Sequence, residues 1–425
     1  MTPELFDDPD YWERAHESAT ALRERGSAHR ATLPSGVRAW VIGDYADARA
    51  ALADPRLSKD GAELRRILGE QLVKLGKDPE QSRMFGSSLL MMDDPRHAEL
   101  RALVSKVFTL RRIQLLRPRI ERLAAGLLDD LPRRRPVDVI EHFAFPLPLI
   151  VICELLGVPL DERAPLREWT AALMEDDPDR VLPASHAMQD YFDKLIIAKR
   201  SAPDDGLLSA LVTLSDNGDL RGDELMDMVF LLLVAGHETS TNLIGNGMRN
   251  LLAIPERWRL LGDRPALIPR AIEEMLRHDC PIRMAPYRWT KEPVRYGDVL
   301  IPAGEIVLVS LLSAGRDPAQ YPNPDELDLH REAKHLSFGQ GIHYCLGAPL
   351  ARLEAEIAFT ALTRTFPRAC LAVDETQLRH KPSVIMHGLD SLPVLLSGGR
   401  SRWAVVLTAL RRLIRWQVRR RAGTG

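Results

Sequence analysis

The spacing of apolar and polar positions predicts a mainly helical chain. Apolar residues recur at intervals of three and four, the pattern of helices with one buried face, at residues 11–25, 45–54 and 96–108. Short apolar runs typical of strands lie at residues 37–43, 299–310 and 391–397. We therefore expect many helices and a small β portion.

The longest predicted helix begins after Asp223, a residue type that caps helix N-termini, and ends near Leu252. About 30 residues span roughly 45 Å, the width of a whole domain. Its first half is apolar on every side, so it should be buried, yet the polar segment AGHETST (235–241) follows. This segment is either a kink in the core or a site of chemistry. A zinc site is not indicated, because Thr241 rather than His stands four residues after His237.

Composition and charge narrow the class of protein. The chain has 425 residues, 45% of them hydrophobic, enough for a large core. Its net charge is −2, but residues 401–425 carry seven arginines and no acidic residue, which leaves −9 on residues 1–400. The four cysteines lie far apart without a CxxC pair, so neither a disulfide framework nor a zinc cluster is indicated. With an N-terminal segment that lacks an apolar core, we expect a cytoplasmic protein with no nucleic-acid partner.

The most unusual segment is FGQGIHYCLG, Phe338 to Gly347. It is not a phosphate loop, because it lacks the Lys-Ser/Thr ending, and Tyr344 stands where GxGxxG needs its third glycine. The sequence that follows predicts a helix beginning near Pro349. Cys345 would then lie just before a helix N-terminus, where backbone N–H groups and the helix dipole favour a thiolate. Such a thiolate is a metal ligand or a nucleophile.

These motifs, in this order, resemble those of the cytochrome P450 family, soluble bacterial type, over roughly residues 10–397. The resemblance implies a heme b buried between the long central helix and the cysteine loop with its helix. Cys345 matches the axial thiolate, which pushes electron density onto the iron. In the same motif Phe338 packs near the ligand, while Gly341 and Gly347 let the backbone approach the porphyrin.

The resemblance also assigns the polar segment of the long helix to oxygen activation. The Thr239 hydroxyl can bond back to the Ala235 carbonyl, four residues earlier, and open a groove in the helix. Gly236 would leave room there for O₂, and Glu238 and Thr239 would form an acid–alcohol pair that delivers protons.

Further matches concern structure and heme binding. EEMLR supplies Glu274 and Arg277, and PDELDLHR supplies Arg331; in the family these form a buried structural network. Four cationic positions match contacts to the heme carboxylates, namely His97, Arg101, Arg288 and His343. Each of the four alone would more often be a solvated surface residue, and only their joint occurrence with the other motifs favours a role in heme binding.

Substrate contacts follow only by position in the family. The pocket should draw on the segments 84–91 and 165–195 and on the side chains of Met84, Leu90, Leu232, Ile282, Arg283 and Ile385. Most of these are apolar, as a hydrophobic ligand requires, but such residues are also ordinary core. Arg283 either meets a polar group of the substrate or faces outward.

The resemblance implies a single monooxygenase domain, residues 1–400, that inserts one oxygen atom of O₂ into a mainly apolar small molecule, usually by hydroxylation, in secondary-metabolite biosynthesis. Electrons from NAD(P)H would come through ferredoxin reductase and ferredoxin, since the chain has no flavin or iron–sulfur module of its own. Three alternatives stay open: a peroxide-driven enzyme, a non-catalytic helper or scaffold of the same fold, and an oxidase that couples aromatic rings on a carrier-bound peptide.

Two charged features concern partners. Four arginines that follow the helix at 96–108 would lie on the face that receives the ferredoxin, or on an ordinary solvated face: Arg111, Arg112, Arg117 and Arg119. Residues 401–425 predict a basic amphipathic helix that is too short in its apolar run to span a bilayer. This extension could lie on a membrane surface, contact a partner or have no function. We expect a monomer.

Overall fold

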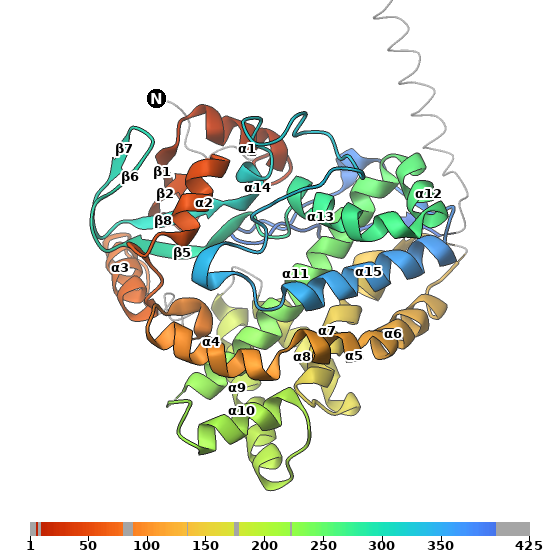
Figure 1. Cartoon of the computed structure of the whole chain (residues 1–425), viewed down its shortest axis with the longest axis horizontal. Coiled ribbons are helices and arrows are strands. Elements are labelled where there is room, and N and C mark those ends of the chain that lie inside the picture. Colours follow the sequence, from red (N-terminus) through yellow and green to blue (C-terminus); the bar gives the residue numbers. More distant parts are fainter. Residues whose placement is uncertain are drawn as a thin grey trace, which may run out of the picture.

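Helices make up most of the computed structural model, which describes residues 6, 10–79, 88–133, 135–173, 178–221 and 223–396 (Figure 1). The α-helices are α1 (Ala15–Glu24), α2 (Tyr45–Ala53), α3 (Gly61–Lys74), α4 (Arg96–Val107), α5 (Leu110–Leu115), α6 (Arg117–Asp129), α7 (Pro146–Leu155), α8 (Arg163–Leu173), α9 (Pro178–Ser201), α10 (Leu207–Asp216), α11 (Glu224–Leu252), α12 (Pro255–Asp263), α13 (Ile268–His278), α14 (Leu311–Ala314) and α15 (Ala348–Thr365).

The strands are short and few. They are β1 (Ala28–Thr32), β2 (Arg38–Ile42), β3 (Leu57–Ser58), β4 (Val137–Asp138), β5 (Met284–Thr290), β6 (Val294–Tyr296), β7 (Val299–Ile301), β8 (Ile306–Ser310), β9 (Cys370–Leu371) and β10 (Pro393–Leu395). The fold is thus mainly α with a small β portion, and this prediction is confirmed.

The main sheet has the strand order β1-β2-β8-β5-β3. β2 and β8 are parallel, while the other neighbours in this sheet are antiparallel. The central strand β8 is buried at every position, which explains its continuous apolar sequence. At the edge, Leu57 of β3 pairs with Thr290 of β5, and Ser58 pairs with Trp289. This register brings the segment after β3 beside the middle of β5.

Helix α11 passes through the middle of the molecule, with the main sheet on one side and α9 and α10 at the opposite end (Figure 1). Its second half joins α6, α7, α13 and α15 in the largest apolar cluster. Its first half packs with α7, α9 and α10 in a second cluster. The long helix predicted from the sequence is confirmed within one residue at its start, although Asp223 makes no side-chain capping bond. The expected burial of its first half is found only in part: Phe230, Leu231 and Leu232 are half-buried, whereas residues 240–248 are buried throughout.

The division into a domain of residues 1–400 and an extension of residues 401–425 stays a prediction. Residues 397–425 lie outside the described residues.

Candidate active site

The cysteine loop lies between a short 3₁₀ turn, Gly341–His343, and the N-terminus of α15. The Cys345 N–H donates to the Phe338 carbonyl at 2.8 Å, which closes the loop on itself. α15 begins at Ala348 with proline in its first turn, one residue earlier than expected. The loop therefore holds Cys345 directly before a helix N-terminus.

Two opposing effects act on the pKa of the Cys345 thiol. Burial raises the pKa of the Cys345 thiol, while the backbone N–H groups of Gly347 and Ala348 and the guanidinium groups of Arg101 and Arg352 act in the opposite direction. A group with this set of donors suits a ligand that is bound as a thiolate, because the donors are already in place before the metal neutralises the charge.

The loop glycines and Phe338 make close contacts within the protein, and their expected roles beside the heme stay predictions. Gly341 has a φ of +73°, and a β-carbon there would lie 3.1 Å from the Ala53 Cα of α2. Both the positive φ and the close packing against α2 therefore require glycine at position 341. A β-carbon at Gly347 would lie 3.7 Å from the Cys345 sulfur. Phe338 packs under Arg352, whose guanidinium lies 4.5 Å from the ring centroid.

The polar segment of α11 has the expected back-bond. Thr239 Oγ1 donates to the Ala235 carbonyl at 2.9 Å. Glu238 is buried, and its Oε1 accepts from Lys381 Nζ at 2.9 Å. A β-carbon at Gly236 would lie 3.2 Å from the Ile152 side chain of α7, so close packing of the two helices also favours glycine there. That Gly236 leaves room for O₂ stays a prediction. Ala235 lies on the exposed side of the helix.

The four cationic positions named from the sequence lie near one another, together with a fifth that the sequence did not indicate. The rings of His97 and His343 have centroids 4.4 Å apart. Arg101 donates to the Tyr344 carbonyl at 2.7 Å, beside His343 in the cysteine loop. Burial, with the neighbouring cations, lowers the pKa of His343 to about 2. We call this set the cation cluster: Lys59, His97, Arg101, Arg288 and His343.

The cation cluster has few anions of its own. Arg288 is 3% exposed, and within the described part of the chain no carboxylate lies within ion-pair distance of it. Its guanidinium reaches the carbonyl oxygens of Pro286 and Leu52, each at 3.4 Å. His97 is buried with Nδ1 3.4 Å from Asp94 Oδ1 and neither ring nitrogen in a hydrogen bond. Such buried groups normally have partners, so the cluster fits a ligand that carries carboxylates.

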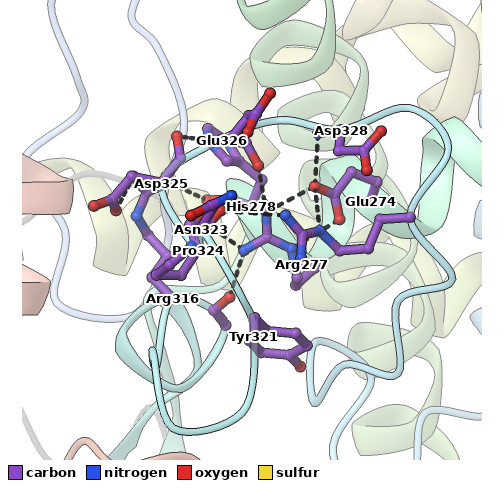
Figure 2. Close-up of polar contacts among 12 residues, drawn as sticks. Glu274, Arg277, His278, Arg316, Tyr321, Asn323, Pro324, Asp325, Glu326 and Asp328 are labelled. Atoms are coloured by element: carbon purple, nitrogen blue, oxygen red, sulfur yellow. Dashed lines mark hydrogen bonds and ion pairs between the residues drawn. The ribbon is translucent and has the colours of Figure 1, made fainter.

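In a second charged region the charged groups are paired with one another and with main-chain carbonyl oxygens (Figure 2). Glu274 and Arg277 on α13 are fully buried and form a bidentate pair, with N–O distances of 2.8 and 2.7 Å. The other Arg277 donors reach the carbonyl oxygens of Gly315, Pro324 and Glu326. Arg331 Nε donates to Glu274 Oε1 at 3.1 Å. We call Glu274, Arg277 and Arg331 the ExxR network.

Three of the residues expected around the substrate lie side by side: Ile282 forms a β-bridge with Met386, and the Arg283 N–H donates to the Ile385 carbonyl at 2.7 Å. The apolar residues of the expected pocket belong to three apolar clusters. Leu90 and Ile385 pack beside the main sheet, Leu232 packs in the cluster of α7, α9 and α10, and Ile282 packs near β5. Met84 lies outside the described residues.

Arg283 does not face outward, so that alternative is wrong. It is 1% exposed, its guanidinium stacks over Tyr11 and Trp12 at 5.2 Å from each ring centroid, and it lies 3.1 Å from His387 Nδ1. The N-terminal aromatic residues cover it, which no local pattern around Arg283 could have indicated.

Three further ionisable residues in or beside the interior were not predicted from the sequence. Lys381 lies beyond the cysteine helix in a segment without a motif, and only the fold brings it to Glu238. Glu354 of α15 is buried beside Ser240, and burial raises the pKa of its carboxyl group to about 8. Lys59 follows β3, where a lysine usually indicates a solvated strand end. Nothing in the sequence around Lys59 indicates burial. Its environment depends on the pairing of β3 with β5, the strand that carries Arg288.

A mainly helical fold, a cysteine held directly before a helix N-terminus and a cluster of cationic side chains without enough anions are the features expected of a heme-thiolate enzyme. A family model described as "Cytochrome P450" matches residues 263–390. Cytochrome P450 107B1 of Saccharopolyspora erythraea is 45% identical over 392 residues, 92% of this chain and 96% of the relative. The cytochrome P450 monooxygenase PikC of Streptomyces venezuelae is 44% identical, over 89% of this chain and 90% of the relative.

A solved structure, the tirandamycin C-bound P450 monooxygenase TamI, superposes with a TM-score of 0.87 at 43% identity and covers 93% of this chain and 100% of that one. The chain belongs to the cytochrome P450 family, as the sequence motifs predicted. It is a P450 monooxygenase, and the family uses heme b and O₂, with electrons from NAD(P)H supplied through redox partners. No helix among the described residues is long and apolar enough to cross a membrane.

Proposed function

We propose that this chain hydroxylates a mainly apolar small molecule in secondary-metabolite biosynthesis. The names of several relatives support this reaction: they include a 6-deoxyerythronolide B hydroxylase of Saccharopolyspora erythraea, 40% identical to this chain, and a mycinamicin IV hydroxylase/epoxidase of Micromonospora griseorubida, 39% identical. The apolar character of Leu90, Leu232, Ile282 and Ile385 supports an apolar substrate.

Cys345 is the proposed metal ligand, and this assignment carries the proposed function. Its sulfur faces N–H groups of Gly347 and Ala348 at the start of α15, with Arg101 and Arg352 nearby. These donors offset part of the cost of burying a thiolate, and a metal ion would supply the rest. Heme, when bound, supplies the activation of O₂; the loop supplies the ligand and its electrostatic support.

Glu238 and Thr239 are the proposed proton-handling pair. The bond from Thr239 Oγ1 to the Ala235 carbonyl fixes the hydroxyl on one side of α11. Glu238 stays buried because Lys381 pairs with it, and Lys381 itself is partly exposed. Glu238 is therefore buried but paired with a group that solvent reaches, which supports a role in proton delivery.

The cation cluster is the proposed site for the heme carboxylates. His97, Arg101, Arg288 and His343 supply the donors, and the two carboxylates would offset the guanidinium groups of Arg101 and Arg288, which form no ion pair within the described residues. Glu274, Arg277 and Arg331 have a structural role in this proposal, because their polar groups are already occupied by one another and by main-chain carbonyls.

Ferredoxin and ferredoxin reductase are the proposed electron donors. The protein itself is proposed to be a monomer in the cytoplasm. Arg111 and Arg112 are exposed on α5, flanked by the exposed side chains of Leu110 and Leu115. This mixture of cationic and apolar groups suits an acidic protein partner. Arg117 and Arg119 contribute less, because they pair with Glu356 and Glu154. The buried thiols of Cys153 and Cys280 are consistent with a reducing compartment.

The test is the absorption spectrum of the reduced, carbon monoxide-bound protein beside a Cys345→Ser variant. We expect a far red-shifted Soret band in the wild type and its loss in the variant, since the hydroxyl cannot replace the thiolate. The matched control is Cys370→Ser, which replaces a cysteine of β9 outside the loop and should keep the band. The same ordinary band in all three proteins, or a wild type without heme, would contradict the proposal.

A further inference from the structure

Lys59 is a buried lysine that the mechanism above does not use. Its side chain is 2% exposed, although lysine is almost never fully buried unless it is paired. Its main-chain N–H donates to Asp93 Oδ1 at 2.9 Å. No carboxylate among the described residues lies within ion-pair distance of its ammonium group. The nearest candidate, Asp93, is already engaged through Oδ2 with Ser58 at 2.5 Å and with Lys291 at 2.8 Å.

The fold places Lys59 in the cation cluster by strand register. β3 and β5 are antiparallel with Leu57 opposite Thr290 and Ser58 opposite Trp289. The next pair along this register is Lys59 and Arg288, whose side chains then project from the same face. Arg288 in turn reaches Leu52 of α2, and the α2 end touches Gly341 of the cysteine loop. The strand edge, α2 and the loop thus enclose the two side chains together.

The electrostatics agree with this placement. Burial, followed by the neighbouring charge of Arg288, holds the pKa of Lys59 well below its usual range, and only Asp93 acts against them. Lys59 is also the first among the charges that lower the pKa of His343. Two cations next to each other in a buried site destabilise the protein unless a ligand supplies negative charge.

We propose that Lys59 binds a carboxylate of the heme, as a further cation beside Arg288, and so retains the cofactor and raises its reduction potential. This inference rests on the proposed function of the cation cluster. The ammonium group donates a charge-assisted hydrogen bond to the carboxylate, and the carboxylate removes the repulsion between Lys59 and Arg288. A positive charge held near the iron also favours the ferrous state over the ferric state, because the reduced centre carries one positive charge fewer.

The test compares the heme-bound wild type with Lys59→Met and Lys59→Gln. Transfer of heme to excess apomyoglobin gives the rate of heme loss, and spectroelectrochemical titration gives the potential of the ferric/ferrous couple. We expect heme loss to become about tenfold faster in both variants, the size expected for one lost charge-assisted hydrogen bond, and the potential to fall. Lys59→Arg, which keeps the charge, should recover most of the potential.

Lys291→Met is the matched control. Lys291 is 44% exposed and pairs with the same Asp93, so the variant removes a lysine from this neighbourhood without removing a buried cation from the cluster. It should leave both readouts unchanged. If Lys59→Met and Lys59→Gln have the heme-loss rate and potential of the wild type, the proposed role of Lys59 is wrong, while the proposed function still stands. A wild type that binds no heme would overturn the proposed function and this inference together.

Discussion

Two buried charged regions of this molecule differ in how their charges are balanced. In the ExxR network, the five N–H groups of Arg277 each have an acceptor, and Glu274 accepts from Arg277, Arg331 and the Asp328 N–H (Figure 2). In the cation cluster, Arg288 has only long contacts to main-chain carbonyls within the described residues, and neither ring nitrogen of His97 is in a hydrogen bond.

The difference separates structural charge from charge kept for a ligand. Burying an ion costs several kcal/mol, and a partner must offset that cost. The ExxR network contains its partners, so it can hold α13 against the segment 322–331 in any state of the protein. The cation cluster lacks them, so part of its stability depends on what binds there. Each region can be tested by removing one charge.

The largest expected effect is that of Glu274→Gln. The variant leaves Arg277 fully buried without a carboxylate and removes the anion that Arg331 contacts, and breaking a buried pair typically costs about 3–5 kcal/mol. We expect a large fall in the urea concentration at the unfolding midpoint, followed by far-UV circular dichroism. Glu332→Gln is the control: Glu332 pairs with Arg270 on the surface and its side chain is 83% exposed, so its midpoint should stay close to the wild type. Equal midpoints in the two variants would contradict a structural role for the network.

A smaller effect on stability, with a larger effect on the cofactor, is expected for Arg288→Met. Removing a buried cation that has no counter-ion relieves a cost in the protein, but removes a bidentate donor from the heme. Bonds of this type are worth about 1.5–3 kcal/mol, so heme loss should become roughly 10- to 100-fold faster. Transfer to apomyoglobin measures the rate. Arg295→Met, an exposed position on the neighbouring β6, should match the wild type; an unchanged rate in Arg288→Met would place the carboxylates elsewhere.

The contrast also explains which features could be predicted from the sequence. α11 was predicted nearly to the residue, because a long apolar run bounded by Asp223 is a local signal. Cys345 stood out because glycine spacing and a following helix are also local. Glu274 and Arg277 lie three residues apart on one helix, so their pairing follows from helix geometry.

The misses share one physical cause: their environments come from segments distant in sequence. Lys59 is buried because β3 pairs with a strand more than 200 residues later. Arg283 is buried because Tyr11 and Trp12 cover it. The close approach of Ile152 of α7 to Gly236 likewise comes from a distant segment. For Lys59 and Arg283 the residue type alone indicated a solvated position, and tertiary packing overrode it.

The smallest expected effect concerns a histidine cluster between α1, α11 and the segment 379–390. It belongs to neither of the two charged regions compared above. His380 is 7% exposed and stacks on His387 with ring centroids 4.9 Å apart. Neither of its ring nitrogens is in a hydrogen bond. The titratable and charged groups around it are Glu13, His16, Arg249, Asp279, Arg283 and His387. Burial lowers the pKa of His380 to about 2, with His387 as the next cause.

This pKa lies below the value of about 6.5 in an unfolded chain, so the neutral ring contributes stability that is present above pH 6.5 and is lost as the pH falls. At pH 5.5 the loss is about 1 kcal/mol for this one histidine. We expect the urea midpoint to fall between pH 7.5 and pH 5.5, and to fall less in His380→Phe, which keeps the stacked ring and sacrifices no hydrogen bond. His186→Phe, at an exposed site on α9, should keep the full decrease. An equal decrease in His380→Phe and the wild type would show that His380 takes up no additional proton on unfolding.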